Sequence, residues 1–165
     1  SLMAKNKEEK TNVMRVPEQK KIAYTPHSYP HEEGMAVDGV TVAKSMGFDP
    51  AIVFKTLVAR GASKQYYVFD VPVAENLDLK KAAKAVGEKS IEMIHQKELL
   101  PLTGYVHGGC SPVGMKKLFP TVIDASAENL PTMIVSAGKI GYQVELAPHD
   151  LAALVRAKFA DIIVE

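Results

Sequence analysis

The sequence predicts an α+β fold, with mixed α/β character, in which a curled, barrel-like mixed sheet is flanked by helices. Two runs rich in β-branched and aromatic residues, 52–59 and 65–71, are joined by a short turn that contains Gly61, as in a hairpin. Helical patterns lie between and around the strand-like runs, which is typical of a sheet covered by helices. Three more such runs follow later in the chain, at 121–125, 132–136 and 141–146.

The first helix is predicted within residues 5–23, with Thr11 as a suitable N-cap. Pro17 would cost about 3 kcal/mol in a helix interior but little in a first turn, so we expect this helix to start or kink near Val16. The rest of this half is predicted to contain an extended run at 23–29, a helix at 38–46 that Asp38 caps and Gly47 ends, and the hairpin.

The second half is predicted to contain shorter elements. Gly87 ends a helix over 77–86, and Pro101 stops one or two helical turns over 96–100. Proline at position 148 is suited to the first turn of a last helix over 148–159. The remaining predicted elements are strands at 90–94 and 104–107 and a helical turn at 115–119.

Length and composition indicate one globular domain spanning residues 1–165. We expect residues 1–10 to be a flexible N-terminal tail, in which Ser1 and Leu2 precede Met3 as a cloning remnant. A single cysteine excludes a disulfide framework and a Cys-based zinc cluster, and no metal or cofactor is expected. No apolar run approaches the roughly 20 residues of a membrane helix, and the start lacks a signal-peptide core, so we expect a cytoplasmic protein without membrane contact.

The formal net charge is +1, so any contact with RNA must come from a local patch rather than a global basic field. Residues 80–117 carry a balance of +4, and residues 118–165 a balance of −3. Solvated helix faces are the simpler explanation. The alternative is a modest basic rim near a functional loop.

Lys55 is the most informative residue of the chain. It lies in an otherwise almost wholly apolar strand, so its ammonium group must reach solvent, find partners or line a pocket. A pocket lysine could stabilise a developing oxyanion or bind a phosphate or carboxylate. Strand alternation predicts that Thr56 faces away from Lys55 unless the strand twists or bulges.

The loop at 108–114 contains Gly108, Gly109 and Pro112, which favour a tight turn whose free amides could bind an anion. A purely structural turn is the alternative. Cys110 lies in the same loop, but no nucleophile motif surrounds it, and a lone cysteine is more often a small buried hydrophobe. No Walker or Rossmann spacing occurs in the chain.

Two further features could contribute to a site. Ser136 and Gly138 belong to a turn between two predicted strands, which is either an ordinary hairpin turn or a source of a hydroxyl and backbone amides for an ester or phosphate. Tyr29 ends the first extended run and could stack on a nucleobase or bond a ribose, or could be a half-buried ring with its hydroxyl outward. His27 and His31 are separated by Pro30 and follow Pro26, so no helix aligns them for a metal.

Three ordered blocks carry a resemblance over about residues 11–159. The chain resembles the YbaK/EbsC family of free-standing Cys-tRNA(Pro) deacylases and, more widely, the editing domain inserted in prolyl-tRNA synthetases. The resemblance implies a sheet curled toward a barrel and flanked by helices. The blocks are VFKTL at 53–57, YVHGGCSPVGMKK at 105–117 and VSAGKIGYQVELAP at 135–148.

The resemblance implies hydrolysis of the ester between a mischarged amino acid and the 3′ end of tRNA. It makes Lys55 the catalytic residue. The implied nucleophile is the substrate cysteine's own thiol, with water as the rival, and the implied partners are Cys-tRNA(Pro) and, transiently, prolyl-tRNA synthetase. Alternatives are a deacylase for Ala-tRNA(Pro) or another small aminoacyl-tRNA, and a non-catalytic module that binds an RNA end or small ligand. The implied substrate-binding residues are Tyr29, Thr56, Gly108, Gly109, Pro112, Ser136 and Gly138.

Overall fold

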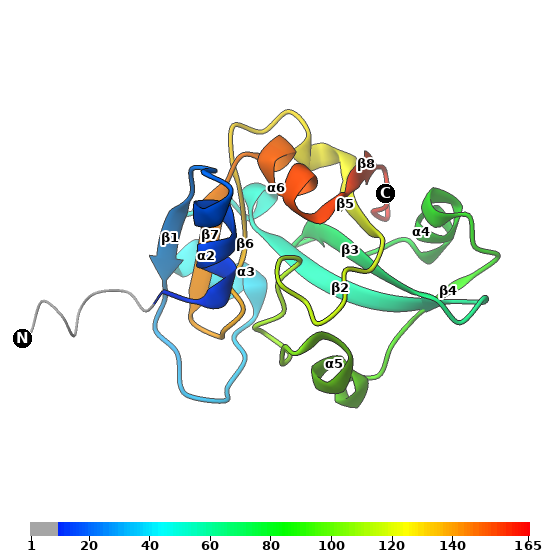
Figure 1. Ribbon diagram of the computed structural model, residues 1–165, viewed down its shortest axis with the longest axis horizontal. Helices are drawn as coiled ribbons and strands as arrows, with labels where there is room; N and C mark the ends of the chain where they lie inside the picture. Colours follow the sequence, from blue (N-terminus) through cyan, green and yellow to red (C-terminus); the bar gives the residue numbers. More distant parts are fainter. Residues whose placement is uncertain (1–9) are drawn as a thin grey trace, which may run out of the picture.

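The computed structural model describes residues 10–165 (Figure 1). The predicted tail at 1–10 and the start of the helix predicted over 5–23 therefore lie mostly outside the described residues. Lys10, the first described residue, is held in place, because its Nζ lies 3.0 Å from Oε2 of Glu18.

Two sheets form the centre of the fold (Figure 1). The larger has the strand order β4-β2-β3-β5-β8, with β2 antiparallel to β3 and β4 but β5 parallel to both β3 and β8, so the predicted mixed sheet is confirmed. The smaller sheet, β1-β7-β6, is antiparallel throughout. The strands are β1 (Thr25–Ser28), β2 (Phe54–Gly61), β3 (Tyr66–Pro72), β4 (Ile91–Met93), β5 (Thr121–Asp124), β6 (Met133–Ser136), β7 (Tyr142–Leu146) and β8 (Lys158–Ala160).

The sheets meet where β2 and β6 approach each other. A parallel bridge between Val53 and Ile134 joins the two sheets at that point, and they do not close into a barrel within the described residues. The predicted α+β class is confirmed, and its curled sheet consists of two open sheets in contact. This junction leaves room for a cavity beside β2.

Five α-helices surround the sheets in the described part of the chain. Thr11 caps the first of them through a hydrogen bond from the amide of Met14, and this helix starts at Asn12 rather than near Val16. The cap explains the difference, because it secures one full turn before Pro17. The helices are α2 (Asn12–Gln19), α3 (Gly39–Ser45), α4 (Leu79–Val86), α5 (Gln96–Thr103) and α6 (Pro148–Val155), with short 3₁₀ turns at Pro50–Ile52 and Ala125–Ala127.

Helix α5 continues through Pro101, where the sequence predicts a stop. A proline removes only its own N–H, and the carbonyl that loses this bond lies in the first turn of α5. The helix ends instead at Gly104, whose φ of 87° is left-handed and whose amide donates to the carbonyl of Leu100 at 2.9 Å. Residues 104–107 are therefore a loop, and the strand prediction there is wrong.

Two other boundaries differ from prediction. The predicted helical turn at 115–119 is irregular, with Lys116 N–H bonded to the carbonyl of Thr103. The last helix ends at Val155, because Arg156 takes a left-handed φ of 56° and the following residues form β8 on the edge of β5. No helix among residues 10–165 is long and apolar enough to span a bilayer.

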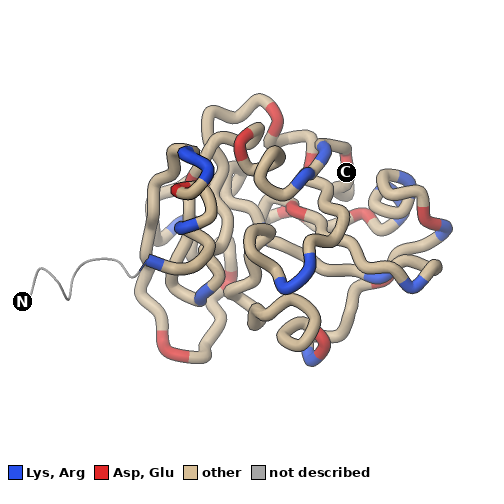
Figure 2. Tube along the Cα trace, viewed as in Figure 1, with Lys and Arg blue, Asp and Glu red and all other residues tan. Residues whose placement is uncertain are grey.

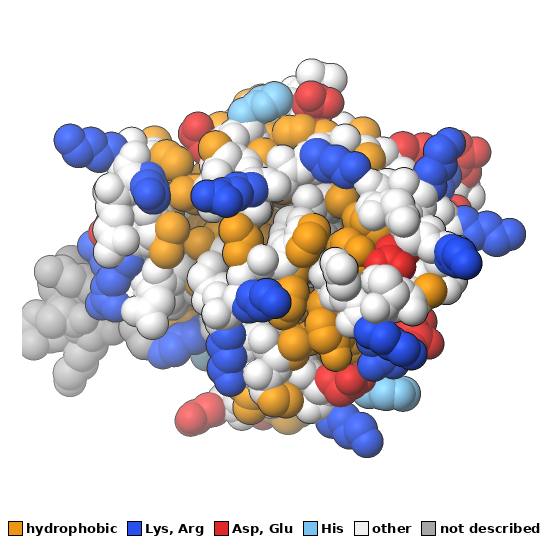
Figure 3. All heavy atoms as spheres, turned by 45° about the vertical axis from the view of Figure 1, so that its right-hand side comes forward, with side chains coloured by type: hydrophobic (Ala, Val, Ile, Leu, Met, Phe, Trp, Pro, Cys, Tyr) orange, Lys and Arg blue, Asp and Glu red, His pale blue; other side chains and the backbone are white. Residues whose placement is uncertain are grey.

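The locally basic stretch divides between two parts of the molecule. Its first lysines lie on α4, at the far end of the larger sheet from β6 and β7 (Figure 1), where Lys81 Nζ lies 3.1 Å from Oδ2 of Asp161. Lys116 and Lys117 lie in the loop after α5. Figure 2 shows Lys and Arg positions distributed along the chain with Asp and Glu positions between them, and on the face in Figure 3 the Lys and Arg side chains are dispersed, with Asp and Glu mostly toward the margins. The predicted solvated helix face therefore describes α4 better than a continuous basic rim does.

Candidate active site

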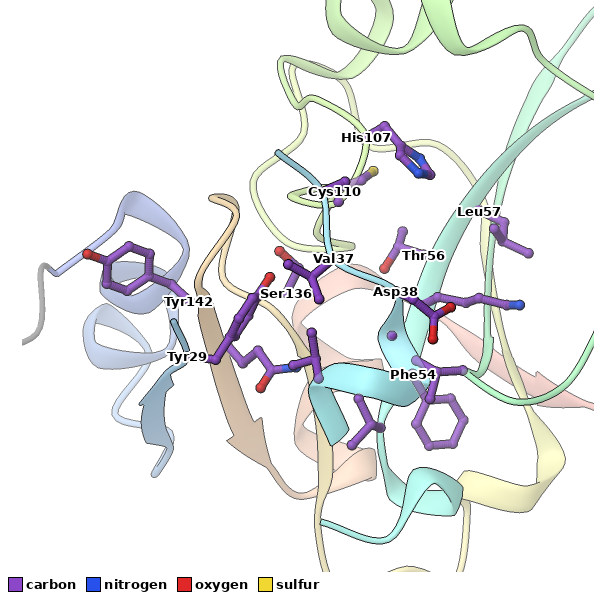
Figure 4. A pocket seen from close by; sticks show the side chains of 18 of the residues that line it. Tyr29, Val37, Asp38, Phe54, Thr56, Leu57, His107, Cys110, Ser136 and Tyr142 are labelled. Carbon is purple, nitrogen blue, oxygen red and sulfur yellow. The ribbon is translucent and has the colours of Figure 1, made fainter. Parts of the chain in front are cut away.

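A cavity of about 430 Å³ lies at the junction of the two sheets (Figure 4). Its wall is built by β2, by the segment that leads into α3, by the loop after α5 and by the smaller sheet. Five of the residues predicted from the sequence line it together: Tyr29, Lys55, Thr56, Gly108 and Ser136. Segments more than 100 residues apart in the chain therefore converge on one small space.

The remaining predicted residues, Gly109, Pro112 and Gly138, do not line this cavity. Gly109 lies against the backbone of the 136–141 turn, since a Cβ built on it would be 3.1 Å from the amide nitrogen of Ile140. Gly138 has a left-handed φ of 93°, and a Cβ there would meet Val13 at 2.9 Å. Pro112 is buried. They lie in the loops behind the cavity wall, and their contact with a substrate stays a prediction.

Lys55 and Thr56 both line the cavity although adjacent strand residues point to opposite faces. β2 pairs with β4 only from Ala59 to Gly61, so its first half has an open edge on that side. The cavity lies against this edge, where side chains from both faces of the strand reach it. In Figure 4, Thr56, Ser136 and Tyr29 extend into the same space, whereas the ring of Tyr142 points away toward α2.

The side chain of Lys55 is half-buried, and its ammonium group forms no hydrogen bond or ion pair within residues 10–165. Burial lowers the pKa of its ammonium group, while the nearby carboxylates of Asp38 and Glu75 act in the opposite direction. Asp38 is also the N-cap of α3 and lines the cavity. A cation that is partly desolvated and has no bonded partner is well placed to stabilise negative charge on a ligand.

Ser136 presents a hydroxyl donor to the cavity. Its oxygen accepts the amide hydrogen of Gly138 at 3.1 Å, which leaves the hydroxyl hydrogen for a ligand. The same bond occupies the Gly138 amide, which the sequence offers as a donor to an ester or phosphate. Gly108, by contrast, lines the cavity, and its amide has no partner among the described residues.

Comparison with known proteins defines the family. Residues 31–154 match the model of the aminoacyl-tRNA editing domain. The chain belongs to this family. The match covers α3, β2, both loops of the candidate site and most of α6, so every lining residue of the cavity except Tyr29 lies within the editing domain.

Two similar proteins have names that refer to tRNA deacylation or editing, and a third shares the fold. The chain is 45% identical over 161 residues, 97% of its own length and 98% of the relative's, to EbsC of Enterococcus faecalis (strain ATCC 700802 / V583), a protein named as a candidate Cys-tRNA(Pro)/Cys-tRNA(Cys) deacylase. It is 25% identical to a crystal structure described as a candidate trans-editing enzyme for prolyl-tRNA synthetase, with a TM-score of 0.78 and coverage of 93% and 95%. The hypothetical protein APE2540 shares the fold alone, with 19% identity, a TM-score of 0.81 and coverage of 92% and 99%.

Cys110 lines the cavity of the editing domain, but its thiol is not activated. It is 8% exposed and packs in a cluster that contains Val58, Val68 and Leu99. Burial, with a contribution from Asp70, raises the pKa of Cys110 to about 12, so the thiol is protonated at neutral pH. A protonated thiol is a poor nucleophile, which agrees with the interpretation of Cys110 as a small buried hydrophobe.

Three polar residues of the site are absent from the sequence-based prediction. Asp38 is predicted only as a helix cap. Gln143, in β7, is 6% exposed and lines the cavity, and its Oε1 is buried without a hydrogen-bond partner within residues 10–165. Asp70, in β3, is fully buried and bonds Thr56. Its position inside the apolar run QYYVFDV is the signal that could have identified it.

Proposed function

We propose that the protein is an aminoacyl-tRNA deacylase that removes cysteine from mischarged Cys-tRNA(Pro). One observation carries the proposal: the half-buried Lys55 and Ser136 line the same cavity, whose volume of about 430 Å³ has room for a small aminoacyl group. Membership of the editing-domain family and the names of the relatives support it. A synthetase pocket made for proline excludes cysteine poorly, because both are small, so a second site must correct the error.

The proposed nucleophile is the substrate's own thiol, whose reference pKa is about 8.5. Its sulfur attacks the ester carbonyl carbon, the bond from that carbon to the ribose oxygen breaks, and the thiol proton ends on the ribose oxygen. Cysteine leaves as a four-membered thiolactone, which water then opens to free cysteine. Lys55, Ser136 and the Gly108 amide stabilise the negative charge that forms on the carbonyl oxygen. Because neither a protein nucleophile nor a metal is used, the unreactive Cys110 fits this scheme.

The direct test is to incubate the purified protein with labelled Cys-tRNA(Pro) and to measure release of the amino acid. Release well above the buffer rate is expected. Release at the buffer rate together with tRNA binding would instead identify a non-catalytic module. Equal turnover of Ala-tRNA(Pro) would identify a deacylase for small aminoacyl groups in general, and would require water as the nucleophile.

The source of the thiol is tested with one altered substrate and one variant. S-methylcysteinyl-tRNA(Pro) differs from the cysteinyl ester by one added methyl group and has no thiol that can ionise, so its cleavage should fall at least a hundredfold. Cys110→Ala should keep the Cys-tRNA(Pro) rate within about twofold, since the Cys110 thiol stays protonated. Trapping of the released thiolactone with an added amine would identify the cyclic product. Loss of activity in Cys110→Ala with the S-methyl ester still cleaved would reverse the assignment.

We also propose that tRNA selection depends on a transient complex with prolyl-tRNA synthetase. A net charge of +1 and the dispersed cations of Figure 3 support only weak binding of tRNA by this protein alone. At near-physiological salt the protein should elute separately from tRNA on a sizing column, and should shift to larger size when synthetase and tRNA(Pro) are both present. Tight co-elution with tRNA in the absence of synthetase would contradict this.

A further inference from the structure

Asp70 lies behind the cavity wall, on β3, directly across the sheet from Thr56 of β2. Its carboxyl group is fully buried. Oδ1 lies 2.5 Å from the Thr56 hydroxyl oxygen, and Oδ2 is buried with no hydrogen-bond partner among the described residues. A buried carboxyl group with a single hydrogen bond is costly, so its position in the sheet calls for a reason beyond packing.

This contact determines the polarity of the Thr56 hydroxyl. An ionised carboxylate only accepts hydrogen bonds, so the single hydroxyl hydrogen of Thr56 is directed at Asp70. The lone pairs of the Thr56 oxygen then remain for the cavity, which Thr56 lines. Ser136 differs, because its oxygen already accepts one backbone amide while its hydroxyl hydrogen remains available to donate. The cavity thus presents one hydroxyl as an acceptor and another as a donor.

We propose that Asp70 is a positioning residue that orients Thr56 to accept a hydrogen bond from a donor at the aminoacyl end of the substrate. Two groups of that end have the required chemistry: the α-ammonium group of the amino acid and the 2′-hydroxyl of the terminal ribose. The inference rests on the proposed deacylation. It adds the acceptor that would orient the ester against Lys55 and Ser136.

Asp70 can change between its protonated and its ionised form near neutral pH. Burial raises the pKa of Asp70 to about 7, and the hydrogen bond from Thr56 acts in the opposite direction. The groups facing it are the Thr56 hydroxyl from β2, the apolar Ile123 that pairs with it from β5, and the Cys110 thiol from the loop after α5. The thiol stays neutral in this range, so the ionisation of Asp70 itself governs the polarity of Thr56.

The test is Asp70→Asn, which preserves shape but can donate its amide N–H to the Thr56 oxygen and so turn the hydroxyl hydrogen toward the cavity. We expect kcat/KM for Cys-tRNA(Pro) to fall about ten- to a hundredfold, the range that corresponds to one hydrogen bond to a charged group. The ratio of wild-type to variant activity should rise between pH 6 and pH 8, as Asp70 ionises in the wild type. The substrate thiol is common to both proteins and cancels in this ratio.

Two substrate analogues distinguish the possible donors. One carries cysteine on a terminal 2′-deoxyadenosine, and the other replaces cysteine by 3-mercaptopropionate, which lacks the amino group. The analogue that lacks the donor should lower kcat/KM of the wild type at least tenfold relative to Cys-tRNA(Pro). The same analogue should lower kcat/KM of Asp70→Asn less than twofold, because the variant no longer offers the acceptor. Equal losses in both proteins for both analogues would overturn the inference.

Asp124→Asn is the matched control, because Asp124 is also a buried aspartate but bonds the amides of Ser126 and Ile162, away from the cavity. Asp124→Asn should be less stable than the wild type, but the ratio of wild-type to Asp124→Asn activity should not change with pH. If Asp70→Asn does not fold, Thr56→Val removes the acceptor directly and should abolish the same analogue sensitivity; retained sensitivity would overturn the inference. An inactive wild type would refute the deacylase function, whereas an active wild type with a constant Asp70→Asn ratio would refute only the role of Asp70.

Discussion

Replacing Lys55 by methionine is expected to lower kcat/KM for Cys-tRNA(Pro) by about 10²–10³, the loss typical of removing one donor to an oxyanion. Methionine keeps much of the apolar stem and removes the charge, so the wall of the cavity should stay packed. The melting temperature should change little. The ammonium group of Lys55 forms no hydrogen bond or ion pair within residues 10–165, so the substitution takes no bond from a described partner.

The pH dependence gives this prediction a second readout. The protonated ammonium group is the active form, so activity above the buffer rate should decline as pH rises through the pKa of Lys55. Burial lowers this pKa, so the decline should begin below the usual lysine range. Lys44→Met is the matched control, because Lys44 is an exposed lysine of the neighbouring α3 and does not line the cavity. If kcat/KM of Lys55→Met for Cys-tRNA(Pro) stays within twofold of the wild-type value, Lys55 has no part in the mechanism.

Gly108→Ala is expected to damage both stability and activity. Gly108 has a φ of +88°, where an L-residue costs roughly 1–2 kcal/mol. A Cβ there would also lie 2.7 Å from Cβ and 3.2 Å from Cα of Ala36, so the backbone of one segment must move. Such overpacking costs about 1–3 kcal/mol more. Both Gly108 and Ala36 line the cavity, so the shift should also reduce kcat/KM at least tenfold.

Gly34→Ala separates the cost of a left-handed φ from the cost of the close contact with Ala36. Gly34 has a similar φ of +75°, but a Cβ built on it has nothing within 4 Å. It should therefore lower the melting temperature by only a few degrees, as about 1–2 kcal/mol does in a protein of this size, and leave kcat/KM unchanged. Calorimetry and the deacylation assay on both variants check the prediction. Equal effects of the two substitutions would show that contact with Ala36 is unimportant.

Local sequence patterns were sufficient for the central elements. The runs of β-branched and aromatic residues and the turn with Gly61 predict the β2–β3 hairpin, and Gly87 ends α4 as predicted. The helix starts two residues later than the predicted 77, because Asp78 is its N-cap. Where an element depends on a distant partner, the patterns fail. Residues 158–160 extend the helical pattern of α6, yet they form β8, because β5 offers them an open parallel edge.

The candidate site divides in the same way. Lys55 and the glycine-bearing loops stand out in the sequence, because a charge in an apolar strand and a cluster of glycines are visible without a fold. The charge of Asp70 in an apolar run is visible in the sequence as well, but only the fold shows that its Oδ2 and the Oε1 of Gln143 are buried without a partner among the described residues. Chemistry encoded in single residues could be read along the chain, whereas hydrogen-bond polarity and desolvation depend on which segments the folded protein brings together.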